Sequence, residues 1–114
     1  MKREAKIWGE RWLVREDSTH ATSYLKLEKN SICSWHKHEN KYNLFVVLSG
    51  FLTLYIEELE TIKEINLYSG EEFTIKPGQW HSFKTSIVDA RVIEEMYVLY
   101  EESDIIRKKV GSKL

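Results

Sequence analysis

The chain has 114 residues, 42% of them hydrophobic and 31% charged, which is ordinary for one globular domain. With 17 basic and 18 acidic residues the net charge is −1, so no basic field is available for nucleic acid. The longest apolar run, 44–48, is too short to span a membrane, and no apolar segment follows the charged N-terminus as in a signal peptide. The single Cys33 cannot form an internal disulfide, which favours a reducing cytoplasm.

Short apolar segments alternate with turn residues along the chain, and this spacing predicts an all-β domain. Segment 43–48 is apolar on both faces, which indicates a strand buried on both sides. Asn30 lies in a predicted turn and tolerates the left-handed backbone that such a turn needs. The acidic run 57–64 predicts a loose hairpin connection, and 105–109 predicts a short helical turn with acids before it and bases at its end. The predicted strands are 8–14, 24–27, 32–38, 43–48, 51–56, 63–68, 72–75, 80–85 and 91–100.

Three histidines carry the strongest chemical signal. His36 and His38 are two residues apart on a predicted strand, so both imidazoles lie on one face, with Cys33 expected on the other. His81 follows a Pro-Gly turn. Three convergent imidazoles on β scaffolding suit a divalent transition metal, whereas the alternative is a set of hydrogen-bonded core histidines. Asn43 begins the next strand, where its amide can bind the metal or a metal-bound water, or instead cap the turn.

The spacing resembles the first motif of the cupin superfamily, G-x5-H-x-H-x3,4-E-x6-G. His36, His38 and Gly50 match this motif, while Asn30 stands at the first glycine and Asn43 at the glutamate.

The second cupin motif, G-x5-P-x-G-x2-H-x3-N, matches at Gly70, Gly78 and His81. Lys76 stands at the proline and Thr85 at the final asparagine. The resemblance implies an all-β cupin double-stranded β-helix, or jelly roll, of two antiparallel sheets. We expect one domain over 1–114, with its core at about 23–100 between an N-terminal strand and the C-terminal helical turn.

Shorter segments resemble the cupin domain of type II mannose-6-phosphate isomerases, which interconvert ketose and aldose phosphates using a divalent metal. These segments are Trp8-Gly9, Leu48-Ser49-Gly50, the run from Ile75 to His81, and Tyr100 with Ser103 to Arg107.

The resemblance implies a metal site of three histidines and one glutamate, at His36, His38, His81 and position 43. Asn43 departs from it and removes a negative charge, which disfavours Mn²⁺ relative to Zn²⁺, Fe²⁺, Ni²⁺ or Cu²⁺. A site of three histidines is also known among cupins, including some that bind iron and oxidise small thiols. The identity of the divalent metal stays open.

Three functions follow as hypotheses. The first is a metal-dependent enzyme on a small polar metabolite, with a sugar or sugar phosphate preferred, in which Glu94 or Glu95 moves a proton because strand alternation sends one of them inward. The second is a three-histidine iron oxygenase. The third is a non-catalytic ligand-binding or sensing cupin in which the metal is structural or absent.

Two expectations concern partners. The cations expected near the ligand are Lys26, Lys76, Lys84 and Arg91, which form no clustered pair. A homodimer is expected from the resemblance, because an N-terminal strand carrying Ile7, Trp8 and Trp12 can swap or pack across an interface.

Overall fold

The computed structural model describes residues 1–98, 101, 103–109 and 111–113, and every regular element in this part of the chain is a β-strand. None of the described residues forms a helix of the length and apolarity needed to cross a membrane. The strands are β1 (Lys2–Lys6), β2 (Gly9–Glu16), β3 (His20–Leu27), β4 (Ser31–Ile32), β5 (Trp35–Lys37), β6 (Lys41–Ser49), β7 (Phe51–Glu58), β8 (Thr61–Tyr68), β9 (Glu72–Ile75), β10 (His81–Thr85), β11 (Ala90–Val98), β12 (Ile106–Lys109) and β13 (Ser112–Lys113).

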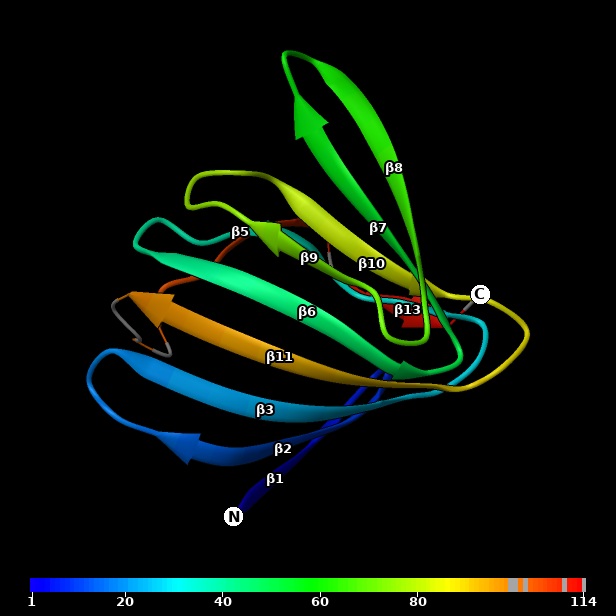
Figure 1. The fold of residues 1–114 in the computed structure, drawn as a ribbon. Helices are drawn as coiled ribbons and strands as arrows, with labels where there is room; N and C mark the ends of the chain where they lie inside the picture. The colour runs from blue at the N-terminus through cyan, green and yellow to red at the C-terminus, as the bar shows by residue number, and fades with distance from the viewer. Residues whose placement is uncertain (99–100, 102, 110, 114) are drawn as a thin grey trace.

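The strands form two antiparallel sheets that face each other (Figure 1). One sheet has the order β1-β2-β3-β11-β6-β9. The other has the order β12-β5-β10-β4-β13, with β7 paired to the free side of β10 and β8 paired to β7. Strands distant in sequence are therefore neighbours, as β3, β11 and β6 are. This arrangement confirms the predicted jelly-roll barrel.

The interior changes from polar to apolar along the barrel, and strand β6 shows this most clearly. Its four inward positions are Lys41, Asn43, Phe45 and Val47, none more than 3% exposed. Phe45 and Val47 belong to the main hydrophobic core, together with residues from β3, β7, β10 and β11. The two polar residues lie toward the other end. An apolar core therefore closes one end of the barrel and supports a polar cavity at the other.

Two turns show why their residues are suited to their positions. Gly50, between β6 and β7, has φ of +83°, and a Cβ atom there would lie 2.4 Å from the backbone oxygen of Asp89. Only glycine fits such a position. Asn30 has φ of +53°, so the predicted left-handed turn is confirmed with asparagine in the place of the motif's glycine.

The predicted strand 32–38 is interrupted. Ile32 pairs with Lys84 and His36 pairs with His81, so the register against β10 shifts by one residue between β4 and β5. This shift is typical of a β-bulge, which changes the face that the following residues occupy. Cys33 therefore joins the core instead of pointing away from His36, and the predicted orientation of Cys33 was wrong.

The C-terminal helical turn predicted over 105–109 was also wrong. Strand β12 occupies this segment and pairs with β5, with Arg107 opposite His36 and Ile106 opposite Lys37. The edge of β5 offers unpaired backbone groups, and satisfying them outweighs the helix-like order of charges. Of the strand predicted over 91–100, the described part ends at Val98. Tyr100, quoted for the isomerase resemblance, lies outside the described residues.

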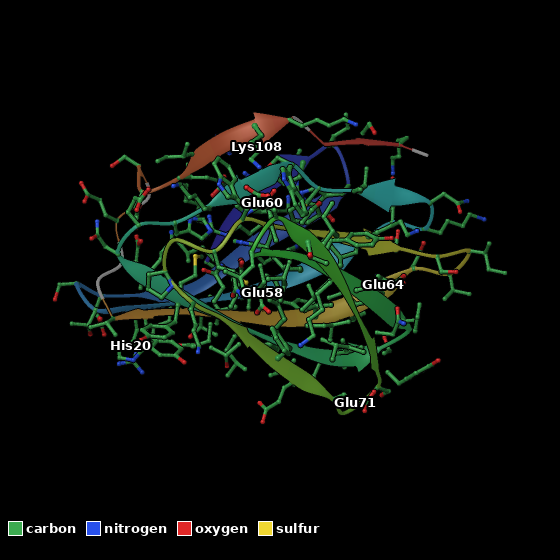
Figure 2. All side chains as sticks on the ribbon, turned by 90° about the horizontal axis from the view of Figure 1, so that it is seen from above. His20, Glu58, Glu60, Glu64, Glu71 and Lys108 are labelled. Atoms are coloured by element: carbon green, nitrogen blue, oxygen red, sulfur yellow. The ribbon has the colours of Figure 1, made fainter. Side chains whose placement is uncertain are left out.

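The acidic run 57–64 is a regular hairpin and not a loose connection. Strand β7 extends to Glu58 and β8 starts at Thr61, so Leu59 and Glu60 alone form the turn, with φ of 47° and 65°. Two positive φ values at the centre of a two-residue turn match the twist of antiparallel strands. Figure 2 shows Glu58, Glu60 and Glu64 on this hairpin, which projects from the barrel in Figure 1.

Candidate metal centre

The structure brings the three predicted histidines together at the polar end of the barrel. His36 lies on β5, His38 follows that strand, and His81 begins β10 opposite His36. One ligand atom from each ring lies within 4.8 Å of the others, and the ring centroids are 4.4 to 5.5 Å apart. A hydrogen bond also fixes the turn before β10 beside His38, because the Gly78 N–H donates to the carbonyl of His38 at 2.6 Å.

Backbone carbonyls fix the tautomer of all three rings. The Nδ1 atoms of His36, His38 and His81 lie 2.8, 2.6 and 2.9 Å from the carbonyl oxygens of Ser34, Asp104 and Gln79. A carbonyl oxygen can only accept, so each Nδ1 carries the proton and each Nε2 keeps a lone pair. This carbonyl-held arrangement is typical of histidines that bind metals through Nε2.

Burial keeps the three rings neutral. Desolvation lowers the pKa of His36 to about 2, with the neighbouring His81 and His38 adding to the effect. Desolvation also lowers the pKa of His38 and of His81 to about 4 each. A neutral imidazole is the form that coordinates a metal, so the cluster needs no deprotonation near neutral pH.

Unsatisfied buried atoms test whether a metal fits the cluster. The Nε2 of His81 and the Oδ1 of Asn43 are buried and have no hydrogen-bond partner among the described residues. Both atoms are acceptors, and leaving a buried acceptor unpaired has a cost of about 1–3 kcal/mol. A divalent cation held by the histidine cluster would satisfy the Nε2 of His81, and three neutral nitrogens suit Zn²⁺, Fe²⁺ or Ni²⁺ better than a hard ion. The residues present fit a transition metal.

Asn43 is held by a second candidate residue, Glu94. The Nδ2 of Asn43 donates to the Oε2 of Glu94 at 2.7 Å, and the Asn43 side chain is fully buried. The amide orientation is thereby fixed, with its oxygen left as the unsatisfied acceptor. The hydrogen bond to Glu94 therefore holds the buried Asn43 side chain inside the barrel.

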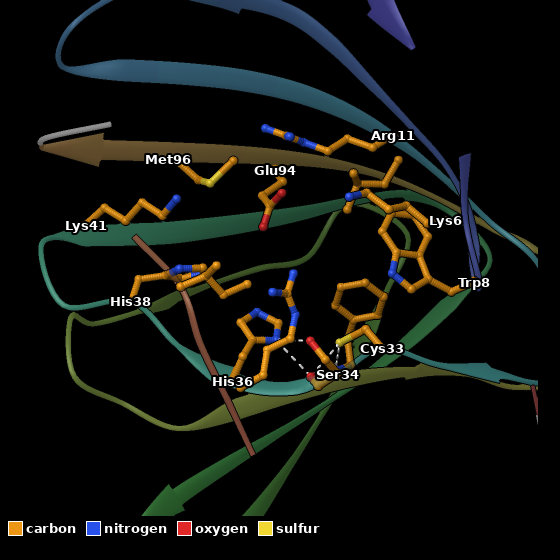
Figure 3. Close-up of a pocket in the computed structure, with 14 residues that line it drawn as sticks. Lys6, Trp8, Arg11, Cys33, Ser34, His36, His38, Lys41, Glu94 and Met96 are labelled. Atoms are coloured by element: carbon orange, nitrogen blue, oxygen red, sulfur yellow. Dashed lines mark hydrogen bonds between the residues drawn. The ribbon is translucent and has the colours of Figure 1, made fainter. Parts of the chain in front are cut away.

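The structure separates the two glutamates that the sequence left as alternatives. Glu94 lines the same cavity as His36 and His38, and Figure 3 shows its carboxylate pointing into that space. Glu95 points to the opposite face of β11, where its carboxylate accepts a hydrogen bond from Thr22. Strand alternation therefore makes Glu94 the candidate acid–base group and leaves Glu95 outside the cavity.

The cavity has a volume of about 330 Å³, and its cations are not those expected. Of the four expected lysines and arginines, none lines it. Lys26 lies over the ring of Trp12 and Lys84 over that of Tyr55, each on an outer sheet face. Trp8, expected at a dimer interface, lines the cavity and packs edge-on against Phe83 at 5.4 Å. The cationic side chains that line the cavity are Lys6, Arg11, Lys41 and Arg107.

These four cations come from β1, β2, β6 and β12. Strands β1 and β12 have no apolar alternation in sequence, so no signal predicted them as strands. The sequence offers one such signal at Lys41, which lies three residues after His38 and could have been expected near the histidines.

No known family model and no curated protein matches this chain. Its fold, however, is similar to several solved structures. Oxalate decarboxylase from Bacillus subtilis superposes with a TM-score of 0.74 at 16% identity, over 87% of this chain and 27% of that one. CapF, solved with the inhibitor 3-isopropenyl-tropolone, gives a TM-score of 0.81 at 16% identity, over 96% of this chain and 34% of that one. KdgF from Halomonas sp. gives 0.74 at 16% identity, over 85% of this chain and 87% of that one.

These likenesses confirm the cupin jelly-roll fold predicted from the motif spacing. The chain spans about a third or less of oxalate decarboxylase and of CapF, whereas it matches most of KdgF. At such low identity the comparison concerns the fold alone, and function has to be argued from the site.

Proposed function

We propose that this protein is a metal-dependent enzyme of the cupin fold that acts on a small polar metabolite, with sugar-phosphate isomerase-like proton transfer as the reaction. The observation that carries the proposal is the set of three neutral histidines, each held by a backbone carbonyl at Nδ1 and facing the others through Nε2. Those residues would hold one divalent metal. The sequence likeness to type II mannose-6-phosphate isomerases supports the reaction class.

The chain's own residues have distinct roles in this mechanism. The metal, when bound, supplies Lewis acidity that polarises a substrate carbonyl or hydroxyl. Glu94 is the base that takes a proton from the carbon beside that carbonyl and returns it to the carbonyl carbon, while the hydroxyl proton moves to the former carbonyl oxygen, so no net proton is consumed. Asn43 donates to Glu94 and keeps its carboxylate in one orientation. Trp8 and Phe83 close the apolar wall of the cavity and keep water from that side.

Elemental analysis of untagged protein purified without a nickel column tests the metal. One equivalent of zinc, iron, manganese or nickel is expected, and the His36→Ala/His81→Ala variant should lose it. Loaded protein should then interconvert an aldose phosphate and its ketose. Glu94→Gln should lower the rate by about 10²- to 10⁴-fold, whereas the matched control Glu95→Gln should change it less than about threefold. Folded wild-type protein that takes up no metal would contradict the proposal.

A three-histidine iron oxygenase is the second candidate, and Asn43 is the observation that favours it. With no carboxylate at position 43, the protein ligands are neutral, and Fe²⁺ bound by three histidines keeps open positions for oxygen and substrate. Oxygen consumption by iron-loaded protein with small thiols separates this candidate from the isomerase. If metal binds but neither reaction occurs, a ligand-binding or sensing role is supported in its place.

A further inference from the structure

One of the three histidines is held differently from the other two. His36 and His81 donate from Nδ1 to carbonyls that lie two residues before them in the chain. His38 donates at 2.6 Å to the carbonyl of Asp104, which follows it by 66 residues. The orientation of the His38 ring therefore depends on where the C-terminal segment 104–109 lies, whereas the other two rings are oriented by their own strands.

The side chain of Asp104 fixes the same contact from a second direction. Its Oδ1 accepts from the Glu39 N–H at 2.8 Å and its Oδ2 accepts from the Asn40 N–H at 2.9 Å. These two amides form the turn that follows His38, between β5 and β6. Hydrogen bonds to an ionised carboxylate are about twice as strong as those between neutral groups. Asp104 thus bonds His38 and both of the next two residues, so the histidine and its turn are held by one side chain and its backbone.

Strand β12 continues this contact along the edge of β5. Arg107 pairs with His36, and both Ile105 and Arg107 line the cavity beside the histidines (Figure 3). The four residues of β12 are exposed, so apolar burial contributes little to its docking. Lys108 adds an ion pair with Glu57 at 2.9 Å, which is a weak contribution near the surface. An exposed edge strand with little apolar burial belongs to the less stable parts of a fold.

We propose that Asp104 is a positioning residue for the metal ligand His38, and that metal binding and docking of segment 104–109 stabilise each other. This inference rests on the proposed function, because the metal is the one assigned there to the histidines. Groups that orient a metal-binding histidine typically raise metal affinity by about 10- to 100-fold. Coupling between two binding events is reciprocal, so a metal that fixes His38 strengthens the docking of Asp104 by the same factor.

Zinc affinity, measured on the full chain in competition with a chromophoric chelator, tests the positioning role. Asp104→Ala removes both bonds to the turn and should weaken zinc binding by about 10- to 100-fold. Asp104→Asn keeps one acceptor oxygen, so its zinc affinity should lie between those of wild type and Asp104→Ala. It carries the test if Asp104→Ala fails to fold.

The matched control is Asp89→Ala. Asp89 also accepts from a backbone N–H distant in sequence, that of Lys29 at 2.8 Å. It lies beside the core residue Ala90 and outside the lining of the cavity. Asp89→Ala should therefore bind zinc within about threefold of wild type.

Amide hydrogen exchange tests the reciprocal effect in the wild type. Zinc should slow exchange of the Glu39 and Asn40 amides, which donate to Asp104, by about fivefold or more. Exchange of the Lys29 amide, which donates to Asp89, should change by less than about twofold. Equal effects of zinc on all three amides would show a general stabilisation and would overturn the coupling.

Metal-free protein separates the failure of this proposal from that of the proposed function. In nitrogen NMR spectra of the imidazoles, Asp104→Ala should convert part of His38 to the tautomer protonated at Nε2 and leave His36 and His81 unchanged. A wild type that binds no zinc would overturn the proposed function and the coupling, and the tautomer comparison would still decide whether Asp104 orients His38. A wild type that binds zinc, with the same affinity and tautomers in Asp104→Ala, would overturn this proposal alone. Equal losses of zinc affinity in Asp104→Ala and Asp89→Ala would also overturn it.

Discussion

Asn43 donates its amide hydrogen to the Oε2 of Glu94 at 2.7 Å, across the β6–β11 ladder in which Asn43 pairs with Met96. The two residues are therefore diagonal neighbours on the inner face. At position 43 the cupin motif has a glutamate. In this chain the carboxylate comes from Glu94 on the adjacent strand, and the amide of Asn43 donates to it. The pair therefore has one carboxylate, whereas a glutamate at position 43 would place two carboxylates side by side and make them repel each other.

Asn43→Asp should destabilise the metal-free protein by about 1–3 kcal/mol at pH 7, because it removes the donor and places two carboxylates in contact. The double variant Asn43→Asp/Glu94→Gln should regain at least half of this loss, since the glutamine amide can donate to the new carboxylate. Urea unfolding of the wild type, both single variants and the double variant gives the coupling energy. Additive single effects would show that the contact contributes nothing to stability.

The elements that the sequence predicted well are those with period-two alternation and turn residues at fixed spacing. His36 and His38 lie on one face as alternation requires, and Asn30 adopts the left-handed turn expected of it. Glu94 and Glu95 could only be left as alternatives, because alternation says that one points inward without saying which. The ladder between β6 and β11 decides which glutamate points inward, because each β11 residue shares the face of the β6 residue opposite it, from Asn43 to Val47.

Other features depend on pairings that a single sequence does not reveal. The bulge between β4 and β5 turns Cys33 inward. It arises because the two strands pair with β10 in registers that differ by one residue. Arg107 reaches the cavity because β12 pairs with β5, although the local charge order favours a helix. Lys6 lies on an N-terminal strand with no hydrophobic alternation. Tertiary pairing overrides local propensity in each case.

Removal of the metal should lower thermal stability. A ligand that binds only the folded state at about 100 times its dissociation constant stabilises by about 2.7 kcal/mol, which corresponds to roughly 10 °C for a domain of this size. Differential scanning fluorimetry of chelator-treated protein, with and without added zinc, measures this shift. His81→Ala should abolish it, whereas His20→Ala, at an exposed position on β3, should retain it. A zinc-dependent shift that persists in His81→Ala would contradict the assigned ligands.

The Cys33 thiol should be inert in the folded protein. Burial raises its pKa from an ordinary value of 9.0 to about 12, and the Phe83 N–H, 3.1 Å from its sulfur, lowers it only in part. At pH 8 a disulfide reagent should therefore modify folded protein at least about 100-fold more slowly than urea-unfolded protein.

The same shift has a consequence for stability. Because the folded state keeps a proton that the unfolded state releases, the Cys33 contribution is complete below pH 9 and is lost as the pH rises from about 9 toward 12. Comparing wild type with Cys33→Ala in urea at pH 8 and pH 10.5 isolates this contribution. Rapid labelling of the folded wild type at pH 8 would show that the thiol is accessible and the assignment of burial incorrect.

Thr85 should be a stabilising residue through its hydroxyl group, although the cupin motif has asparagine at this position. Its Oγ1 accepts from the Ser31 N–H at 2.9 Å and donates to the Glu28 carbonyl at 2.7 Å, and the residue is 3% exposed. Thr85→Val keeps the shape but removes both hydrogen bonds and leaves the buried Ser31 N–H without its hydroxyl partner, so we expect a loss of about 1–3 kcal/mol in urea unfolding. Thr85→Ser keeps both bonds and should lose only about 0.8 kcal/mol for the missing methyl group. Thr74→Val, at a half-buried position on β9 outside this turn, is the control and should change stability by less than about 0.5 kcal/mol. Equal losses in Thr85→Val and Thr85→Ser would mean that side-chain packing, and not the hydrogen bonds of the hydroxyl group, accounts for the contribution of Thr85 to stability.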